Sequence, residues 1–393
     1  MGLDLFWFLP TGGDGRYLSS QEGARDASYG YIRQVAQAVD EVGFIGALLP
    51  TGRYCEEAWI FATSLVPVTQ RMKFIVALRP GLAQPALAAR FASTFDRVSG
   101  GRLVLNVVTG GSGLDAAADG ALVDHDRRYD QTDEFLTIFR RLVSGEQNVS
   151  FDGEFFRIQN GLLAYPTVQK PYPPLYFGGS SDPGHRTAAK HADVYLMWGE
   201  PLHQIRDQIA SVRRYADEQG RTIRFGLRLH VIVRETESEA WDAANTLIRY
   251  IDDDTIALAQ TLLGATESVG QKRMLNLHGG QRDKLVVAPN LWAGIGLVRT
   301  GAGTALVGDP DQVAARLLEY AELGIDTFIL SGYPHLEEAH RTAELLFPRL
   351  PLNPQAVQQK AETVTSFEFS AAAIVKQFGK AALGDAAPTN GKH

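Results

Sequence analysis

Cysteine is almost missing from this chain of 393 residues, because Cys55 is its single example. An intrachain disulfide is therefore impossible, and we expect a protein of a reducing, cytoplasmic setting. Long apolar runs are missing too, since none approaches the roughly 18 residues that span a bilayer. Residues 1–10 contain Asp4 and no basic residue, which is not the pattern of a signal peptide.

Positive charge is in short supply, with 38 Lys and Arg against 45 Asp and Glu, a net charge of −7. Nucleic-acid-binding domains are usually basic, so this balance argues against such a function. Three catalytic motifs are also absent. No G-x-G-x-x-G fingerprint follows the first strand, no G-x-S-x-G elbow occurs, and His335 and His340 are five residues apart rather than the four of a zinc protease. We therefore expect no metal site.

What the chain does contain is a rhythm of short apolar runs, most of them followed by an amphipathic stretch. Such alternation predicts parallel strands joined by helices. Helices are expected at 29–42 and 311–323. The expected strands number eight: 4–9, 44–49, 72–79, 102–109, 174–180, 193–199, 224–233 and 327–333. Eight units predict a closed (β/α)₈ TIM barrel, and an open doubly wound sheet is the alternative.

A bare barrel needs about 250 residues, so part of the chain is additional. The additions lie at 110–128, 146–172, 253–308 and 351–393. We expect one barrel domain over residues 1–350. The glycine-rich end of 253–308 favours a mobile lid, with an ordinary surface insertion as the alternative. The tail 351–393 is expected to be extended or to lie at a subunit interface.

Polar residues at the ends of the predicted strands are the candidates for function, since barrel active sites lie there. Within 224–233, alternation puts Arg224, Arg228 and His230 on one side, expected to face the barrel axis. Burying arginine is costly unless an anion meets it. That anion is either a ligand or an acidic residue on a neighbouring strand.

Four more strand ends carry polar or aromatic groups. Tyr333 and His335 follow strand eight and Trp198 ends strand six, a combination suited to an oxyanion beside a flat ring. Cys55 lies at a strand-to-helix turn, where it is either a reactive thiolate or core filling. The turn Gly178-Gly179-Ser180-Ser181 before a helix is typical of a phosphate cradle. Asn106 fits either the edge of a heterocycle or a turn.

Several blocks in this order resemble the bacterial luciferase-like flavin monooxygenases, and among them the alkanesulfonate monooxygenase group. They run from residue 3 to about residue 350. The blocks are FWFLPTGGDGRYL, LLPTGRYCEEAW, VALRPGLAQPALAARFASTFDR, NVVTGG, PPLYFGGSS, WGEP, RFGLRLHVIVRET, APNLWAGIGLVRTGAGTALVGDP and LSGYPHLEEA.

The resemblance implies an enzyme that uses reduced FMN from a separate NAD(P)H:flavin reductase, and dioxygen, to split the C–S bond of an organosulfonate. Sulfite and an aldehyde would be the products, and the enzyme would be a homo-oligomer, a dimer or tetramer. The implied active-site residues are Cys55, Trp198, Arg228, His230, Arg299, Tyr333 and His335. The implied flavin-binding residues are Ala77, Asn106, Tyr129, Gly178, Ser180 and Ser181.

The chain departs from the family pattern in its first block, which reads PTGGDG where the family has PTHGDG. Gly12 thus replaces a pocket histidine, and Tyr54 stands where a small serine is usual. A wider pocket would follow, which favours a bulky or hydroxylated substrate such as the sulfosugar sulfoquinovose. The alternatives are a plain alkanesulfonate or methanesulfonate monooxygenase, and a non-catalytic flavin-binding homologue.

Overall fold

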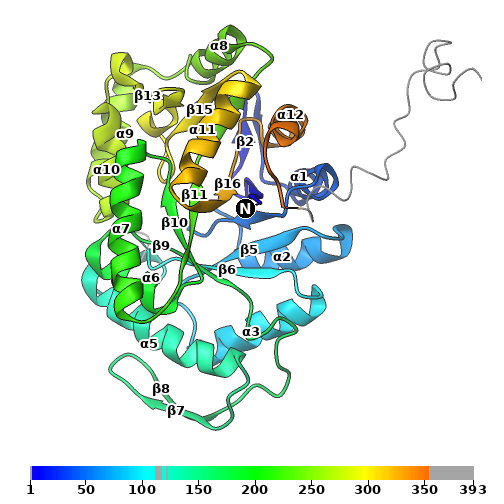
Figure 1. The fold of residues 1–393 in the computed structure, drawn as a ribbon, viewed down its shortest axis with the longest axis vertical. Coiled ribbons are helices and arrows are strands. Elements are labelled where there is room, and N and C mark those ends of the chain that lie inside the picture. The colour runs from blue at the N-terminus through cyan, green and yellow to red at the C-terminus, as the bar shows by residue number, and fades with distance from the viewer. Residues whose placement is uncertain (1, 111–116, 121–122, 354–393) are drawn as a thin grey trace, which may run out of the picture.

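Eight parallel strands close into a barrel at the centre of the computed structural model, which describes residues 2–110, 117–120 and 123–353 (Figure 1). Around the barrel each strand pairs with the next, and the last, β16, pairs with both β11 and β1. The strands are β1 (Asp4–Phe8), β4 (Gly46–Leu49), β5 (Lys73–Leu78), β6 (Leu103–Val107), β9 (Leu175–Gly178), β10 (Val194–Trp198), β11 (Arg224–Arg228) and β16 (Ile325–Ile329). The predicted (β/α)₈ barrel is confirmed.

Helices between the strands cover the outside of the barrel. They are α1 (Tyr29–Val42), α2 (Ala58–Leu65), α3 (Pro85–Val98), α5 (His125–Val143), α6 (Asp182–His191), α7 (Leu202–Glu218), α11 (Pro310–Glu322) and α12 (His335–Leu346). The apolar stripe of α1 is buried, as its spacing predicts. Ser28 caps the start of α1, and Gly43 ends it in the left-handed region that glycine tolerates.

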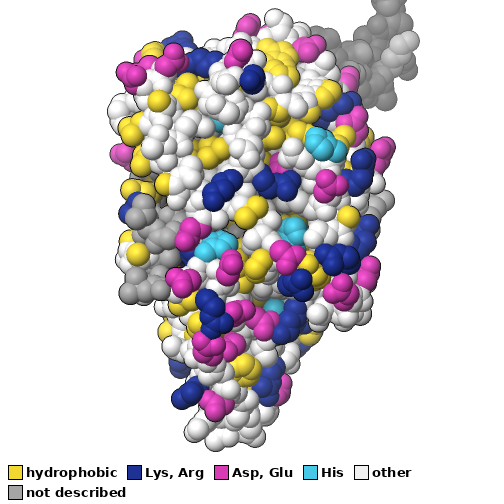
Figure 2. Space-filling model, turned by 90° about the vertical axis from the view of Figure 1, so that its left-hand side faces the viewer, with side chains coloured by type: hydrophobic (Ala, Val, Ile, Leu, Met, Phe, Trp, Pro, Cys, Tyr) yellow, Lys and Arg dark blue, Asp and Glu magenta, His cyan; other side chains and the backbone are white. Residues whose placement is uncertain are grey.

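The surface carries charges of both signs. On the face formed by α6 and α7, acidic and basic side chains alternate without a broad area of one sign (Figure 2). A patch that would hold a nucleic-acid backbone is not visible on this face. Within the described part of the chain, no helix combines the length and apolar character needed to cross a membrane.

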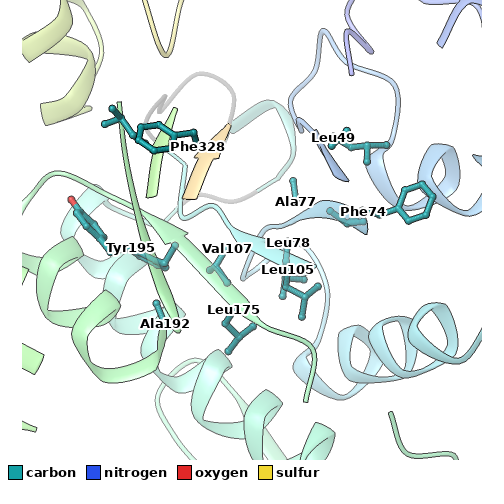
Figure 3. Packing of buried hydrophobic residues seen from close by; sticks show 14 of the residues in the cluster. Leu49, Phe74, Ala77, Leu78, Leu105, Val107, Leu175, Ala192, Tyr195 and Phe328 are labelled. Atoms are coloured by element: carbon teal, nitrogen blue, oxygen red, sulfur yellow. The ribbon is translucent and has the colours of Figure 1, made fainter. Parts of the chain in front are cut away.

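Side chains of the barrel strands alternate between two apolar layers. The larger layer lies between strands and helices; Leu105, Val107 and Leu175 belong to it and pack together in Figure 3. The smaller layer fills the barrel interior. Its members are Phe6, Phe8, Leu48, Ile75, Val104, Tyr176, Val194 and Ile329. This alternation identifies which residues face the barrel axis, and thus which ones reach the mouth of the barrel.

The insertion 253–308 is built from regular elements. It holds α9 (Asp253–Gly264), α10 (Val269–His278), β13 (Val286–Ala288), β14 (Leu291–Trp292) and β15 (Ala305–Gly308), with short 3₁₀ turns at Arg282–Lys284 and Gly294–Leu297. Together with α8 (Glu237–Leu247) it buries a core of its own around Trp292, Ile295 and Leu297. Lid motion of this segment stays a prediction. The addition 146–172 contains the hairpin of β7 (Val149–Asp152) and β8 (Arg157–Gly161).

The predicted strand 224–233 is two strands in the structure. Barrel strand β11 ends at Arg228, and β12 (His230–Val233) pairs with β15 in a separate four-stranded sheet. The amide of His230 donates to the Thr304 carbonyl at 2.9 Å, so the insertion draws this segment out of the barrel. The prediction that His230 and Ile232 continue the barrel strand is therefore wrong.

At the other end of the chain, Asn353 donates its amide to Leu3, which ties the described C-terminus to β1. The rest of the predicted tail lies outside the described residues. The remaining short elements are β2 (Asp14–Gly15), β3 (Ala24–Arg25) and two 3₁₀ turns at Val66–Val68 and Phe347–Arg349.

Candidate active site

The mouth of the barrel, at the carboxyl ends of the strands, collects most of the predicted site residues. Alternation along the barrel strands puts the following residues on the side that faces the barrel axis: Phe8, Ala77, Asn106, Gly178, Trp198 and Arg228. Trp198 and Arg228 are direct neighbours in the β10–β11 register, as are Ala77 and Asn106 in β5–β6. Residues far apart in sequence thus form one rim.

Arg228 is a buried cation without an acidic partner among the described residues, and only 6% of it is exposed. Its Nη1 donates to the Leu229 carbonyl at 2.9 Å, whereas Nη2 is buried and has no hydrogen-bond partner in the described part of the chain. Burial and the positive charge of Arg299 lower the pKa of Arg228. An anion at Nη2 would relieve this cost.

Arg224, on the same strand, behaves differently. It lies at the opposite end of the barrel, where its Nε donates to Asp326 at 2.7 Å and its Nη2 to Asp4 at 3.1 Å. The sequence leaves open whether the anion that meets these arginines is a ligand or an acidic residue of a neighbouring strand, and the two arginines differ in this respect. Arg224 belongs to an ion-pair network, whereas Arg228 has no acidic partner among the described residues.

His230 is fully buried, and both of its ring nitrogens are occupied. Nδ1 lies 2.6 Å from Ser331 Oγ, and Nε2 lies 3.1 Å from the Ala302 carbonyl. Burial, with help from Arg228 and Arg299, holds the pKa of His230 well below its ordinary value. The neutral ring therefore donates from Nε2 and accepts at Nδ1. This arrangement leaves it no lone pair for a substrate.

Tyr333 connects the two histidines of the site. Its ring stacks on His230 with centroids 5.4 Å apart and meets His335 edge-on at 5.0 Å. His335 begins α12 and is buried; its Nδ1 lies 2.9 Å from Asp14. Asp14 is a site residue that the sequence interpretation missed, although it stands in the glycine-rich loop that the interpretation singled out.

Arg299 reaches the same region from the insertion. Its guanidinium lies over the Phe8 ring, 5.7 Å from the centroid, on the ring that Arg228 also contacts. Its Nη1 donates to the carbonyls of Thr300 and Ala302 at 2.9 and 3.3 Å. The two cations thus converge on one aromatic ring at the centre of the mouth.

The turn after β9 forms a cradle at the start of α6. Ser181 is the N-cap of this helix and accepts from the Gly184 amide. The Tyr129 hydroxyl is hydrogen-bonded to Ser181, and burial raises the pKa of Tyr129. A side chain at Gly179 would come within 3.2 Å of the Tyr129 hydroxyl, so only glycine fits there without a shift. Free amides at a helix start favour an anion.

The start of α10 closes one side of this cradle, which the sequence did not predict. A Cβ at Gly270 would lie 3.1 Å from Ser180 Oγ and 3.2 Å from the Trp198 ring. Gln271 accepts from the Gly301 amide at 2.8 Å and from the Thr300 hydroxyl at 3.1 Å. The insertion therefore contributes both a wall and a fixed loop to the site.

Cys55 lies in the loop between β4 and α2 and is partly buried. A Cβ on Gly12 would lie 3.8 Å from its sulfur and only 2.8 Å from the Tyr54 carbonyl oxygen. The backbone of this loop therefore fills part of the space that a histidine side chain would need. The Tyr54 side chain is 77% exposed and does not take the place of the imidazole.

Groups of three or more His, Cys, Asp or Glu side chains that could hold a metal do not occur among residues 2–110, 117–120 and 123–353. Two acidic side chains at the mouth already have partners, because Asp14 contacts His335 and Glu338 accepts from Arg234.

Residues 3–327 match the luciferase-like monooxygenases, and the chain belongs to this family. Among solved structures, long-chain alkane monooxygenase (LadA) is 21% identical, with a TM-score of 0.73 over 97% of this chain and 96% of that one. Riboflavin lyase (RcaE), solved with modified FMN and riboflavin, is 20% identical, with a TM-score of 0.73 over 94% of each chain. DmoA from Hyphomicrobium sulfonivorans is 19% identical, with a TM-score of 0.72 over 96% of this chain and 92% of that one. These likenesses show the fold.

The residues at the mouth fit a flavin mononucleotide. The Ser180–Ser181 cradle at the start of α6 offers amides and hydroxyls to a phosphate. By strand alternation, Gly178 and Ala77 share the side of Tyr176 and Ile75, and as glycine and alanine they add little bulk at the end of the barrel where Trp198 lies. The cradle that a Cβ at Gly179 would fill is the structural feature that supports this fit.

Proposed function

We propose that this protein is a reduced-FMN-dependent monooxygenase that cleaves the C–S bond of an organosulfonate and releases sulfite and an aldehyde. The observation that carries the proposal is Arg228, a buried guanidinium whose Nη2 lacks a partner among the described residues. A second cation, Arg299, lies over the same Phe8 ring. Two cations in one apolar site call for a ligand that is always anionic.

A sulfonate satisfies this requirement. It keeps its charge over the whole physiological pH range and offers three oxygens to guanidinium donors, so it can accept from Arg228 and Arg299 together. When bound, reduced flavin supplies the electrons that activate dioxygen. The chain contributes the Ser180–Ser181 cradle and Tyr129 for the phosphate, and Ala77, Asn106 and Trp198 around the ring.

Exclusion of water is the role we assign to the Arg299 segment. Reactive oxygen chemistry is protected when a site is closed to solvent. Arg299 comes from the insertion, and Gln271 fixes the backbone of the adjacent loop. Closure of this segment over flavin and substrate would join the cation to the anion and shield the reacting atoms at the same time.

The substrate we favour is larger or more hydroxylated than a simple alkanesulfonate, with the sulfosugar sulfoquinovose as the candidate. A hollow of about 320 Å³ lies beside Tyr333, between the Gly12–Gly15 loop and residues 17–27. Tyr17, Ser19 and Ser20 are among its lining residues, and these hydroxyl-bearing residue types suit a polar substrate. This hollow supports the proposal, whereas the replacement of histidine by Gly12 contributes less space than its size suggests.

The proposed partners are a cytoplasmic NAD(P)H:flavin reductase and further copies of this chain. Exposed apolar side chains on α2 and α3 support a homo-oligomer, dimer or tetramer, because a monomer gains nothing from exposing them. These side chains are Ile60, Leu87, Phe91 and Val98.

The test is reconstitution with a flavin reductase, NAD(P)H, FMN, dioxygen and a panel of sulfonates. We expect sulfite only when the protein, the reductase and a sulfonate are all present, and more from sulfosugars than from short alkanesulfonates. Sulfite no higher than in the protein-free control would overturn the monooxygenase proposal. Flavin binding without sulfite from any sulfonate would favour a non-catalytic flavin-binding protein, and preference for short alkanesulfonates would refute the larger substrate.

A further inference from the structure

The two histidines of the site differ in which ring nitrogens are occupied. His230 uses both, on Ser331 and on the Ala302 carbonyl. His335 uses only Nδ1, which lies 2.9 Å from Asp14, and its buried Nε2 has no hydrogen-bond partner in the described part of the chain. Only 2% of His335 is exposed. A buried ring nitrogen without a hydrogen-bond partner costs free energy, so we expect Nε2 to meet a substrate group during turnover.

Asp14 determines which nitrogen of His335 carries the proton. Its side chain is fully buried, one oxygen faces Nδ1, and the other accepts from the His335 amide at 2.7 Å and from the Tyr31 hydroxyl. Burial alone would raise the pKa of Asp14, but the His335 ring and these hydrogen bonds bring that pKa below its ordinary value. An ionised carboxylate only accepts hydrogen bonds, so Nδ1 carries the hydrogen. Nε2 of the neutral ring is then a lone pair.

The His335 ring lies beside the place where the two cations of the site converge. The His335 ring lies 5.6 Å from the Phe8 ring, centroid to centroid. Both guanidiniums of the site lie over the same Phe8 ring. A sulfonate held by Arg228 and Arg299 would therefore lie close to the His335 ring.

We propose that His335 is the general base of this enzyme and that Asp14 is the residue that positions it. In this proposal, Nε2 accepts a proton from the carbon that bears the sulfonate. The inference rests on the proposed function and deepens it, since it identifies the group that takes the proton. His230, which the family resemblance also places at the active site, instead holds the β12–β15 junction together through Ser331 and Ala302.

The proton balance of the overall reaction requires such a group. The C–S bond breaks with its electron pair leaving on sulfite, and the carbon gains a double bond to one oxygen atom of dioxygen. The other oxygen atom leaves as water with two hydrogens and two electrons from reduced flavin. Of the two hydrogens on the carbon, one stays in the aldehyde and one leaves as a proton. Nε2 of His335 accepts that proton.

Other ionisable groups surround the pair and bear on its pH dependence. Tyr333 and His230 face His335 from the end of the barrel, and Tyr31 faces Asp14 from α1. Arg25 donates to the Tyr31 hydroxyl at 3.2 Å and to Glu337 at the start of α12. Tyr31 and Arg25 thus hold the outer side of Asp14, opposite the imidazole. The matched control is His340→Gln, because His340 is an exposed histidine on the same helix and lies outside this network.

The experiment compares Asp14→Asn, His335→Gln, the double variant Asp14→Asn/His335→Gln and the control His340→Gln. For Asp14→Asn we expect a kcat loss of about 100-fold or more, in the range of a misplaced general base, with the KM for the sulfonate within about threefold. His340→Gln should keep a kcat within about threefold of the wild type. The double variant should be no slower than His335→Gln alone.

A second measurement needs no turnover. Protein labelled with ¹⁵N-histidine should show a signal from a neutral ring with hydrogen on Nδ1 that is absent from His335→Gln and is converted to a tautomer mixture in Asp14→Asn. The inference would be overturned if the kcat losses of the two single variants multiplied in the double variant, or if the His335 signal showed hydrogen on Nε2. The tautomer is measured without substrate, so the two failures can be distinguished. If only the sulfonate assay fails, the proposed function is rejected, while the NMR signal still tests whether Asp14 positions His335. Flavin binding and thermal unfolding show that each variant is folded.

Discussion

The guanidinium of Arg228 lies 4.7 Å from the centre of the Phe8 ring, inside the mouth of the barrel. An aromatic face is a weak partner for a cation, worth about 0.5–2 kcal/mol, and cannot replace a carboxylate. Arg299 lies over the same ring, so two positive charges repel each other in one site and the charged form of Arg228 is disfavoured. An anionic ligand would offset both the cost of burying Arg228 and the repulsion between the two cations.

The first prediction concerns this unpaired charge. Arg228→Met should raise the KM for the sulfonate roughly 10- to 100-fold, because a hydrogen bond to a charged group contributes about 1.5–3 kcal/mol. Its unfolding temperature should stay the same or rise, since an uncompensated buried charge is replaced by an apolar chain of similar length. Steady-state sulfite assays and thermal unfolding provide the two measurements.

Arg224→Met is the matched control on the same strand. It removes the partner of Asp326, whose side chain is 6% exposed, so the free energy of unfolding should fall by about 2 kcal/mol. The KM should not change, because Arg224 lies at the other end of the barrel. A raised KM in Arg224→Met with none in Arg228→Met would contradict the assignment of these two arginines.

The second prediction concerns the cradle at the start of α6. Ser181→Ala removes a hydroxyl from the site and the N-cap of the helix, and should weaken FMN binding about tenfold. Riboflavin, which has no phosphate, should bind equally well to both proteins. Quenching of flavin fluorescence measures the two affinities. Ser181→Thr should restore FMN binding, and an equal loss for both flavins would show that the cradle does not hold the phosphate.

Much of the fold could be predicted because its determinants are local. Strands of a parallel barrel are buried on both faces, so they appear as short apolar runs between helical stripes. The predicted bounds of α1 match the observed 29–42, and α11 begins one residue early because Asp309 caps it with Pro310 at its first position. Both signals lie within a few residues of the element they define.

The parts that could not be predicted depend on contacts between distant residues. β12 leaves the barrel because its partner, β15, lies in the insertion, about 75 residues further along the chain. Asp14 and His335 are separated by 321 residues. An aspartate in a glycine-rich loop carries no local sign that a histidine will meet it, so only the closed barrel reveals the pair.

The third prediction concerns closure of the site. Arg299→Ala should lower the ratio of sulfite formed to NAD(P)H consumed, because water reaches the reactive oxygen species before the substrate does. Hydrogen peroxide should account for the difference. Lys272→Ala removes an exposed cation from the same insertion and is the control, with an unchanged ratio expected. Full coupling in Arg299→Ala would refute its protective role.

The fourth prediction concerns Gln271, which joins α10 to the loop that follows Arg299. Its side-chain oxygen accepts from the Gly301 amide and the Thr300 hydroxyl, so Gln271→Ala removes two hydrogen bonds of about 1 kcal/mol each. The loop should open roughly tenfold or more often, and the sulfite ratio should fall as in Arg299→Ala. Gln271→Glu keeps an acceptor oxygen for both hydrogen bonds and should restore most of the coupling. If alanine and glutamate variants behave alike, the acceptor oxygen does not hold the loop, and the fixed position of Arg299 must come from its own bonds to the Thr300 and Ala302 carbonyls.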